Sequence, residues 1–225
     1  MTRTNSPKRP TAEAAMCAVP AHDCGLCPRL VSFRAENRTA FPDKFNAPVP
    51  SFGGMDATFL VVGLAPGLRG ANFSGRPFTG DYAGDLLYKA LLKFGFAKGE
   101  YGAHAEDGLQ LVNCRITNAV RCVPPENKPT PAEMKQCLVF LKAELAAMKN
   151  LRVILSLGKI SHDSVVKSCG GKPGDYKFVH GAAHELPGGV VRLVDSYHCS
   201  RYNTNTGRLT EAMFFDAFKI IKNYL

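Results

Sequence analysis

Four short apolar runs, separated by segments with helical periodicity, constrain the fold of this chain more than any other feature. The strand candidates are ATFLVVGLAPG, LVNCRITNAVRC, RVILSLGK and GVVRLVDSYH. Short continuous apolar runs are typical of strands covered on both faces. Helical spacing of apolar residues marks GDLLYKALLKFGF, TPAEMKQCLVFLKAELAAMKN and LTEAMFFDAFKIIKNYL. The alternation predicts a three-layer α/β/α sandwich with a mainly parallel central sheet.

The length and composition of the chain predict one folded domain. It has 225 residues, of which 45% are hydrophobic, as in ordinary globular proteins. No apolar run approaches the ~18 residues that cross a bilayer, and the basic N-terminus lacks the apolar stretch of a signal peptide. We therefore expect a poorly ordered basic arm over residues 1–20 and a single domain over residues 21–225. We also expect a cytoplasmic monomer that contacts no membrane.

The charge of the chain favours a polyanionic partner. Lys and Arg number 28 against 19 Asp and Glu, which gives a formal net charge of +9. An excess of this size attracts polyanions, and nucleic acid is the usual one. The alternative is a soluble protein that is merely basic, so charge alone does not decide the function.

Three loops rich in polar and small residues follow predicted strands. They are GLAPGLRGANFSGRPFTGD, TNAVRC and SYHCSRYNTNTGRLT. In parallel sheets of this kind, ligands lie outside the carboxyl ends of the strands. We therefore expect the three loops to meet at one edge of the sheet and to form the functional site.

Four cysteines fall in two separated segments of the chain. Cys24 and Cys27 form a Cys-x-x-Cys pair, Cys122 ends a predicted strand, and Cys137 lies in the helix that follows. Structural disulfides are rare in the cytoplasm, so cysteines there indicate either a metal centre or buried thiols. Four thiolates bind either one zinc ion or a four-iron cluster, and the spacing does not choose between them. A redox role is disfavoured because no predicted strand precedes Cys24.

Together these segments resemble the uracil-DNA glycosylase superfamily, and within it the iron–sulfur branch called family 5, or type B. The resemblance covers about residues 22–224 and is carried by CGLCPRL, VVGLAPGLRGANFSGRPFTGD, TNAVRCVPPENKPTPAEMKQC, ILSLGK and SYHCSRYNTNTGRLT. Family 4 is the near neighbour, but it usually has Glu where this chain has Leu64. The resemblance implies a DNA repair enzyme. Such an enzyme flips out uracil, and in this family some other deaminated or oxidised bases, and hydrolyses the N-glycosidic bond to leave an abasic site.

The resemblance also implies the cofactor and the residues that bind the base. The four cysteines would hold a structural 4Fe-4S cluster near the DNA-binding face. Phe78 would stack on the flipped base, and the amide of Asn118 would bind the edge of that base. Gly67 stands where many members have Ala, which would widen the slot for the base. The tight turn whose backbone amides approach the base consists of Gly63, Ala65, Pro66 and Gly67.

Two residues are assigned to catalysis by the resemblance. Asp81 would orient or activate the attacking water, and its position before a predicted helix also suits an N-cap. The competing carboxylate, Asp85, lies one turn into that helix. His198 would donate to the base oxygen O2 and stabilise the departing anion. Cys199 replaces the family's usual proline, and we expect this change to loosen the loop.

The segment after His198 is expected to contact DNA containing uracil or other damaged bases. The candidates that would grip phosphates or probe the duplex are Ser200, Arg201, Tyr202, Asn203 and Arg208. Two other functions remain open, namely a non-catalytic iron–sulfur protein that binds DNA or senses redox state, and a zinc-stabilised nucleotide-binding enzyme. The joint presence of Asp81, Asn118 and His198 disfavours the first. The absence of a Walker-type Gly-Lys-Ser/Thr loop disfavours the second.

Overall fold

A computed structural model describes residues 19–225, and its centre is a mainly parallel β-sheet. Within the described residues this sheet has six strands in the order β1-β5-β2-β6-β8-β7. The parallel strands are β5 (Cys114–Asn118), β2 (Phe59–Gly63), β6 (Val153–Leu157) and β8 (Arg192–Ser196). The antiparallel edge strands are β1 (Phe52–Gly53) and β7 (Ala183–Glu185). Residues 1–18 of the expected basic arm lie outside the described residues.

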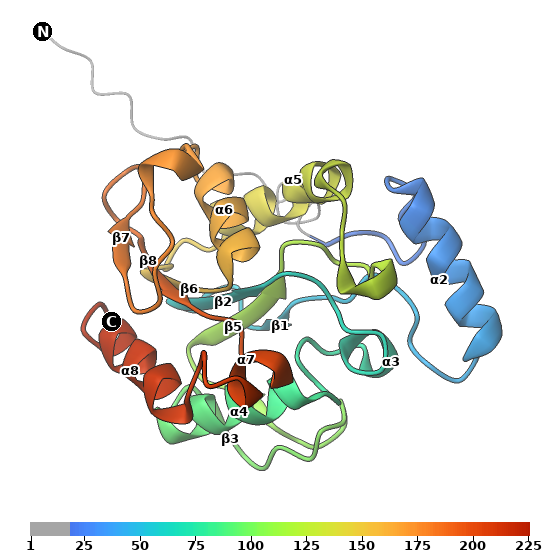
Figure 1. Ribbon diagram of the computed structural model, residues 1–225, viewed down its shortest axis with the longest axis horizontal. Helices are drawn as coiled ribbons and strands as arrows, with labels where there is room; N and C mark the ends of the chain where they lie inside the picture. Colours follow the sequence, from blue (N-terminus) through green and yellow to red (C-terminus); the bar gives the residue numbers. More distant parts are fainter. Residues whose placement is uncertain (1–18) are drawn as a thin grey trace, which may run out of the picture.

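Helices cover both faces of the sheet and give three layers (Figure 1). One face carries α4 (Tyr82–Lys93) and α8 (Glu211–Lys222), and the other carries α5 (Pro131–Ala147) and α6 (Lys159–Ser168). Every residue of β2 is buried, because its side chains alternate between these two covered faces. The predicted three-layer α/β/α sandwich is therefore confirmed.

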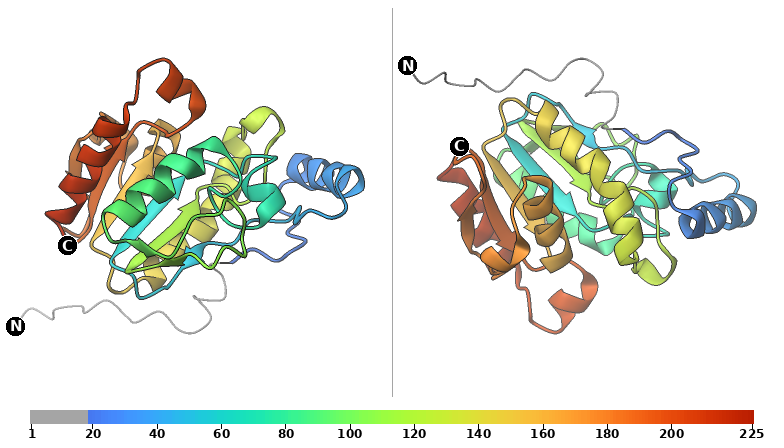
Figure 2. Two further views of the ribbon diagram at one scale, coloured as in Figure 1. Left: turned by 90° about the horizontal axis from the view of Figure 1, so that it is seen from below. Right: turned by 90° about the horizontal axis from the view of Figure 1, so that it is seen from above.

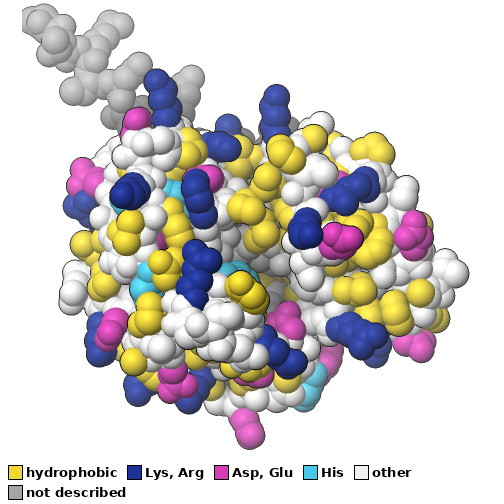
Figure 3. All heavy atoms as spheres, in the orientation of Figure 1, with side chains coloured by type: hydrophobic (Ala, Val, Ile, Leu, Met, Phe, Trp, Pro, Cys, Tyr) yellow, Lys and Arg dark blue, Asp and Glu magenta, His cyan; other side chains and the backbone are white. Residues whose placement is uncertain are grey.

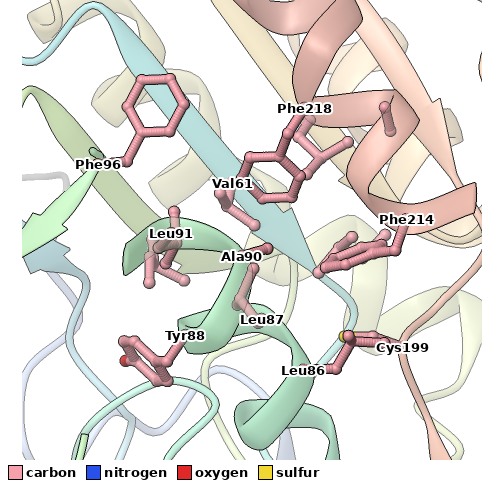
Figure 4. Close-up of a cluster of buried hydrophobic side chains, with 14 of the residues drawn as sticks. Val61, Leu86, Leu87, Tyr88, Ala90, Leu91, Phe96, Cys199, Phe214 and Phe218 are labelled. Carbon is pink, nitrogen blue, oxygen red and sulfur yellow. The ribbon is translucent and has the colours of Figure 1, made fainter. Parts of the chain in front are cut away.

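The larger part of the core lies between the sheet and the helices α4 and α8. Figure 4 shows Val61 of β2 facing Leu87 and Leu91 of α4 and Phe218 of α8, all of them fully buried. Burying each large apolar side chain stabilises the fold by about 1.5–3 kcal/mol. This packing fixes the start of α4 close to the carboxyl end of β2, where the functional site lies.

The remaining elements are short or lie at the edge of the molecule. Helix α2 (Pro28–Ala40) projects beside the sheet rather than covering it (Figure 2). The short elements are α3 (Ala71–Ser74), the pair β3 (Ala97–Lys98) and β4 (Gln110–Leu111), the 3₁₀ turns η1 (Pro125–Asn127) and η2 (Pro173–Asp175), and α7 (Arg201–Asn205). In the described part of the chain, no helix combines the length and the apolar character that crossing a membrane requires.

Candidate active site and cysteine centre

A pocket of about 370 Å³ opens at the carboxyl edge of the parallel strands. Residues from the loops after β2, β5 and β8 all contribute to its wall, so the three loops that were expected to meet do so. The lining residues are Leu64, Ala65, Pro66, Gly67, Ala71, Phe78, Asp81, Tyr82, Ala83, Asn118, Asn127, His198, Ser200 and Arg201.

Asn118 and Phe78 converge above Gly63. A Cβ atom on Gly63 would lie 2.3 Å from Asn118 Oδ1 and 2.5 Å from Phe78 Cζ, so only glycine leaves room for both side chains. Asn118 is 3% exposed, and its Oδ1 is buried without a hydrogen-bond partner among the described residues. A buried acceptor without a donor carries an energetic cost. The pocket therefore presents a preformed acceptor for an N–H group of a ligand.

The backbone of Phe78 has the left-handed value φ 54°, which a bulky residue rarely adopts. Two tyrosines hold it there. The hydroxyl of Tyr101 donates to the carbonyl oxygen of Phe78 at 3.2 Å and accepts from the backbone N–H of Gly80 at 3.4 Å. The hydroxyl of Tyr88 donates to the carbonyl oxygen of Pro77 at 2.8 Å. Strain of this kind persists where neighbouring contacts determine the conformation, and it is common at functional sites.

The side chain of Arg76 also holds the segment that carries Phe78. Its guanidinium forms a bidentate pair with the carboxylate of Asp107 at 2.7 and 2.6 Å, and its Nε donates to Thr79 Oγ1 at 2.8 Å. The hydrogen bonds from Arg76 keep the pKa of Asp107 far below its usual range, so the pair stays ionised. The guanidinium also lies over the rings of Tyr88 and Tyr101, with centroid distances of 5.3 and 5.9 Å. The loop that carries Phe78 is thus fixed to residues far along the chain.

Asp81 lies at the N-terminus of α4, on the wall of the pocket. Its Oδ1 accepts from the backbone N–H of Gly84 at 3.2 Å, so it is the N-cap of the helix. Its Oδ2 faces the preceding turn, because a Cβ atom on Gly70 would lie only 2.3 Å from it. Burial raises the pKa of Asp81 above its ordinary value of 3.8, although backbone hydrogen bonds from Gly84 and Ala83 oppose the change. The carboxylate is therefore poorly solvated and borders the pocket.

His198 faces Phe78 across the pocket. The two ring centroids lie 6.0 Å apart and the ring planes are inclined by 30°. Desolvation in the pocket lowers the pKa of His198 to about 4, so the imidazole is neutral at neutral pH and carries one N–H donor. The amide of Asn203 donates to the carbonyl oxygen of His198 at 2.8 Å and braces the loop.

Cys199 ties the loop of His198 to α4. Its side chain is completely buried, and its Sγ donates to the carbonyl oxygen of Ala83 at 3.3 Å. Figure 4 shows Cys199 within the core cluster, close to side chains of α4. The loop is therefore held by packing and by this contact, in contrast to the loosening expected from the loss of proline.

The residues predicted to contact DNA take different positions relative to the pocket. Ser200 and Arg201 line it, and Tyr202 is 72% exposed. Asn203 points inward to His198, and the guanidinium of Arg208 lies 4.6 Å from the ring centroid of Tyr197. Lys and Arg side chains are spread over the face seen in Figure 3 rather than gathered in one patch.

Several lining residues were not singled out from the sequence. Tyr82 follows Asp81, and its ring lies 5.3 Å from the guanidinium of Arg201. Asn127 lines the pocket from η1, nine residues after Asn118. The only sequence signal for Asn127 is the Pro-rich turn that contains it, since Asn tolerates unusual turn conformations.

The four predicted ligand cysteines line one small pocket beside the active-site pocket. Cys27 precedes α2, Cys122 follows β5, and Cys137 lies in α5. All four are free thiols. Burial raises the pKa of Cys27 to about 11 and that of Cys122 to about 12, so these thiols stay protonated without a cation. A soft cationic centre is the group that such a set of clustered, partly buried cysteines suits.

Positive charge and N–H groups surround these sulfur atoms. Arg34, a buried residue of α2, places Nη1 3.8 Å from Cys122 Sγ, and the backbone N–H of Arg121 donates to Cys137 Sγ at 3.3 Å. Both contacts favour the thiolate form, which is the form that binds a metal centre.

A second cluster of titratable residues surrounds Asp195 of β8. His162 contacts Asp195 through Nδ1 at 2.7 Å and the carbonyl oxygen of Tyr176 through Nε2 at 2.9 Å. Burial alone would lower the pKa of His162, but the hydrogen bond to Asp195 raises it. Asp195 also accepts from Ser156 at 2.7 Å and lies 3.0 Å from His184 Nε2. This network satisfies its own hydrogen bonds and fixes the strand that leads to His198.

Fold and site together define a class, namely three-layer α/β proteins with a ligand pocket at the carboxyl edge of a parallel sheet and a cysteine centre beside it. Residues 50–222 match the family model described as the uracil DNA glycosylase superfamily. The chain belongs to this superfamily, which confirms the resemblance found in the sequence.

Individual relatives agree with this assignment. Over 198 residues the chain is 43% identical to the type-5 uracil-DNA glycosylase of Thermus thermophilus, covering 86% of this chain and 90% of the relative. Over 208 residues it is 43% identical to the type-5 uracil-DNA glycosylase of Mycobacterium bovis, covering 88% and 77%. The type-4 uracil-DNA glycosylase of Pyrobaculum aerophilum is 33% identical over 153 residues, covering 67% and 70%. The chain is thus more similar to these type-5 proteins than to the type-4 protein.

Proposed function

We propose that this protein is a monofunctional DNA glycosylase that removes uracil from DNA, with residues 21–225 as its single catalytic domain. The observation that carries the proposal is the buried, unpartnered Oδ1 of Asn118 beside the ring of Phe78. Uracil has an N–H at position 3 next to a carbonyl oxygen. A primary amide offers the matching acceptor and donor along one edge. The membership of the chain in the superfamily and its type-5 relatives support the same function.

Base binding in this proposal divides between a stacking face and a polar edge. Phe78 stacks on the flipped base, a contact worth about 1–3 kcal/mol. Asn118 Oδ1 accepts from uracil N3–H, and the Nδ2 of the same amide donates to O4. The turn of Gly63, Ala65, Pro66 and Gly67 brings backbone close to the base. We assign substrate selection to Phe78, Asn118 and this turn.

Cleavage in this proposal depends on two residues with different tasks. The bond between C1′ and N1 breaks with its electron pair going to the base, and neutral His198 donates to O2 to stabilise that charge. The sugar develops positive charge, which the carboxylate of Asp81 stabilises while it orients the attacking water. The water oxygen bonds to C1′ and loses a proton to Asp81. The uracil anion then takes up a proton from solvent, and free uracil and an abasic site are the products.

DNA binding is assigned to the segment that follows His198. Ser200 and Arg201 stand at the mouth of the pocket and exposed Tyr202 stands beyond it, so they can contact the strand that carries the flipped nucleotide. Asn203 contributes by bracing His198. Arg208 supplies a further positive charge to the same segment.

The cysteine centre is proposed to hold a 4Fe-4S cluster through Cys24, Cys27, Cys122 and Cys137. A donor set of four thiolates suits such a cluster, and all four cysteines line one small pocket. When bound, the cluster would supply a structural crosslink between the N-terminal segment, the end of β5 and α5.

The proposed function is tested with a duplex that contains one labelled uracil. Incubation with the protein should leave strands that break at the uracil position only after alkali treatment, as a monofunctional glycosylase requires. A duplex with thymine at that position is the control. Binding without any alkali-labile product would favour the non-catalytic DNA-binding alternative.

A further inference from the structure

Part of the rim of the pocket is formed by the loop that joins β5 to α5. Asn127 is the residue of this loop, among positions 119–130, that lines the pocket. The sequence assigned no role to it. Its side chain is exposed, in contrast to Phe78 and Asn118 at the floor, which are 6% and 3% exposed.

The backbone of this loop is strained at two consecutive positions. Glu126 has φ 53° and Asn127 has φ 56°, both in the left-handed region that favours glycine. Asn tolerates this region better than most residues, but Glu does not. A pair of such residues persists only where the surrounding structure holds it, and strain of this kind clusters at ligand sites.

Contacts at the C-terminal end of the loop hold it in place. Arg29 of α2 donates through Nη2 to the carbonyl oxygen of Lys128 at 3.0 Å. Arg29 also forms a bidentate pair with Glu133 at 2.8 and 2.7 Å, and Glu133 completes a capping box with Thr130. The loop begins after Cys122, so its start lies at the cysteine centre. Asn127 therefore belongs to a loop that is tied to α2 and to the start of α5.

We propose that Asn127 binds the sugar–phosphate backbone of the flipped nucleotide, by donation from its side-chain amide to a phosphate oxygen. This inference rests on the proposed function, because it requires a nucleotide whose base fills the floor of the pocket. With the base stacked on Phe78 and its edge against Asn118, the sugar and phosphate must leave the pocket past its rim, and exposed Asn127 and Arg201 both line the pocket. Neutral donors to phosphate fix orientation without reading sequence.

The test compares two glycine variants in the full-length protein with its metal centre intact. Asn127→Gly removes the amide and suits the positive φ, so the loop keeps its path. Glu126→Gly is the matched control, since it relieves the same strain one residue earlier and does not touch the pocket. The measurement is the single-turnover rate of uracil excision from a 5′-labelled duplex as a function of enzyme concentration.

Asn127→Gly should raise the half-saturating enzyme concentration about tenfold, the effect of one hydrogen bond to a charged acceptor. Its dependence on salt should be unchanged, because no charge is lost. Glu126→Gly should not raise it. Asn127→Asp, which keeps the size of the side chain and places a carboxylate against the phosphate, should weaken binding further.

Two results would overturn the inference. One is an Asn127→Gly variant that binds as tightly as the wild type. The other is an Asn127→Asp variant that does so, which decides the matter even if the glycine variant does not fold. A wild-type protein that excises no uracil would refute the proposed function instead, and it is recognised before any variant is compared.

Discussion

Replacing Asp81 by Asn separates the two roles that this side chain has in our account. The amide has nearly the same shape as the carboxylate and can still accept from the N–H of Gly84, which the carboxylate does at 3.2 Å. Asn and Asp are almost equally good N-caps, whereas Ala costs about 1 kcal/mol at such a position. The substitution therefore removes the charge that is proposed to act on water and leaves the start of α4 intact.

The structure predicts opposite effects on rate and stability. Loss of a group that orients water and accepts its proton lowers the rate by about 10²–10⁴-fold. Burial raises the folded-state pKa of Asp81 above its ordinary value, so ionised Asp81 destabilises the folded protein once the pH exceeds both the unfolded and the folded value. At pH 7 the Asn variant should therefore be at least as stable as the wild type while it is far slower.

The raised pKa of Asp81 also predicts how the wild-type rate depends on pH. The single-turnover rate should fall as the pH drops through the raised pKa of Asp81, because the protonated acid cannot accept a proton from water. His198 adds no further loss until about pH 4, where its own lowered pKa lies. In the Asp81→Asn variant the residual rate should lack the limb that Asp81 causes.

The assay is the single-turnover excision rate at saturating enzyme, measured beside thermal unfolding of the same preparations. Asp85→Asn, in the first turn of the same helix, is the matched control and should keep the wild-type rate. A wild-type rate in the Asp81 variant would refute the reasoning. A loss of rate in the Asp85 variant alone would assign the task to the other carboxylate.

Three further results follow from the site. The purified protein should contain iron and absorb broadly near ~400 nm, and Cys122→Ser should lose both iron and thermal stability; zinc as the only stoichiometric metal in anaerobic preparations would contradict this. Arg201→Ala and Arg208→Ala should each lower the slope of log affinity against log salt by about 1, and unchanged slopes would remove these residues from the phosphate contacts. Tyr101→Phe should slow excision at saturating enzyme, because Phe78 loses the hydroxyl that holds its carbonyl oxygen; a change in unfolding temperature without a change in rate would limit Tyr101 to stability.

The central layers could be predicted from the sequence because burial on two faces leaves a plain signal. Strands β2 and β6 are buried at every position, which requires the continuous apolar runs that marked them. The edge strands β1 and β7 have only two and three residues, too few for any pattern. Helix α2 was not predicted for another reason. Its buried residues include polar Arg34 and Asn37, so its sequence has no apolar stripe at helical spacing.

The site residues that could be predicted from the sequence are polar side chains at strand ends or in the loops that follow strands. Asp81, Asn118 and His198 were found in this way, and all three line one pocket. The contacts that hold the site residues in place could not be predicted from the sequence. The hydrogen bond between Tyr101 and Phe78, for example, joins positions 23 residues apart. The burial of Cys199 could not be predicted for the same reason, since its packing against α4 depends on the complete fold.

The most direct test of the central claim is detection of the released base. The protein is incubated in excess with a duplex that has one uracil, and the small molecules are analysed by mass spectrometry. Our account predicts one free uracil per duplex and an otherwise intact strand with an abasic site, and it predicts that Asn118→Ala releases far less. No uracil released by the folded wild-type protein at saturating concentration would contradict the account.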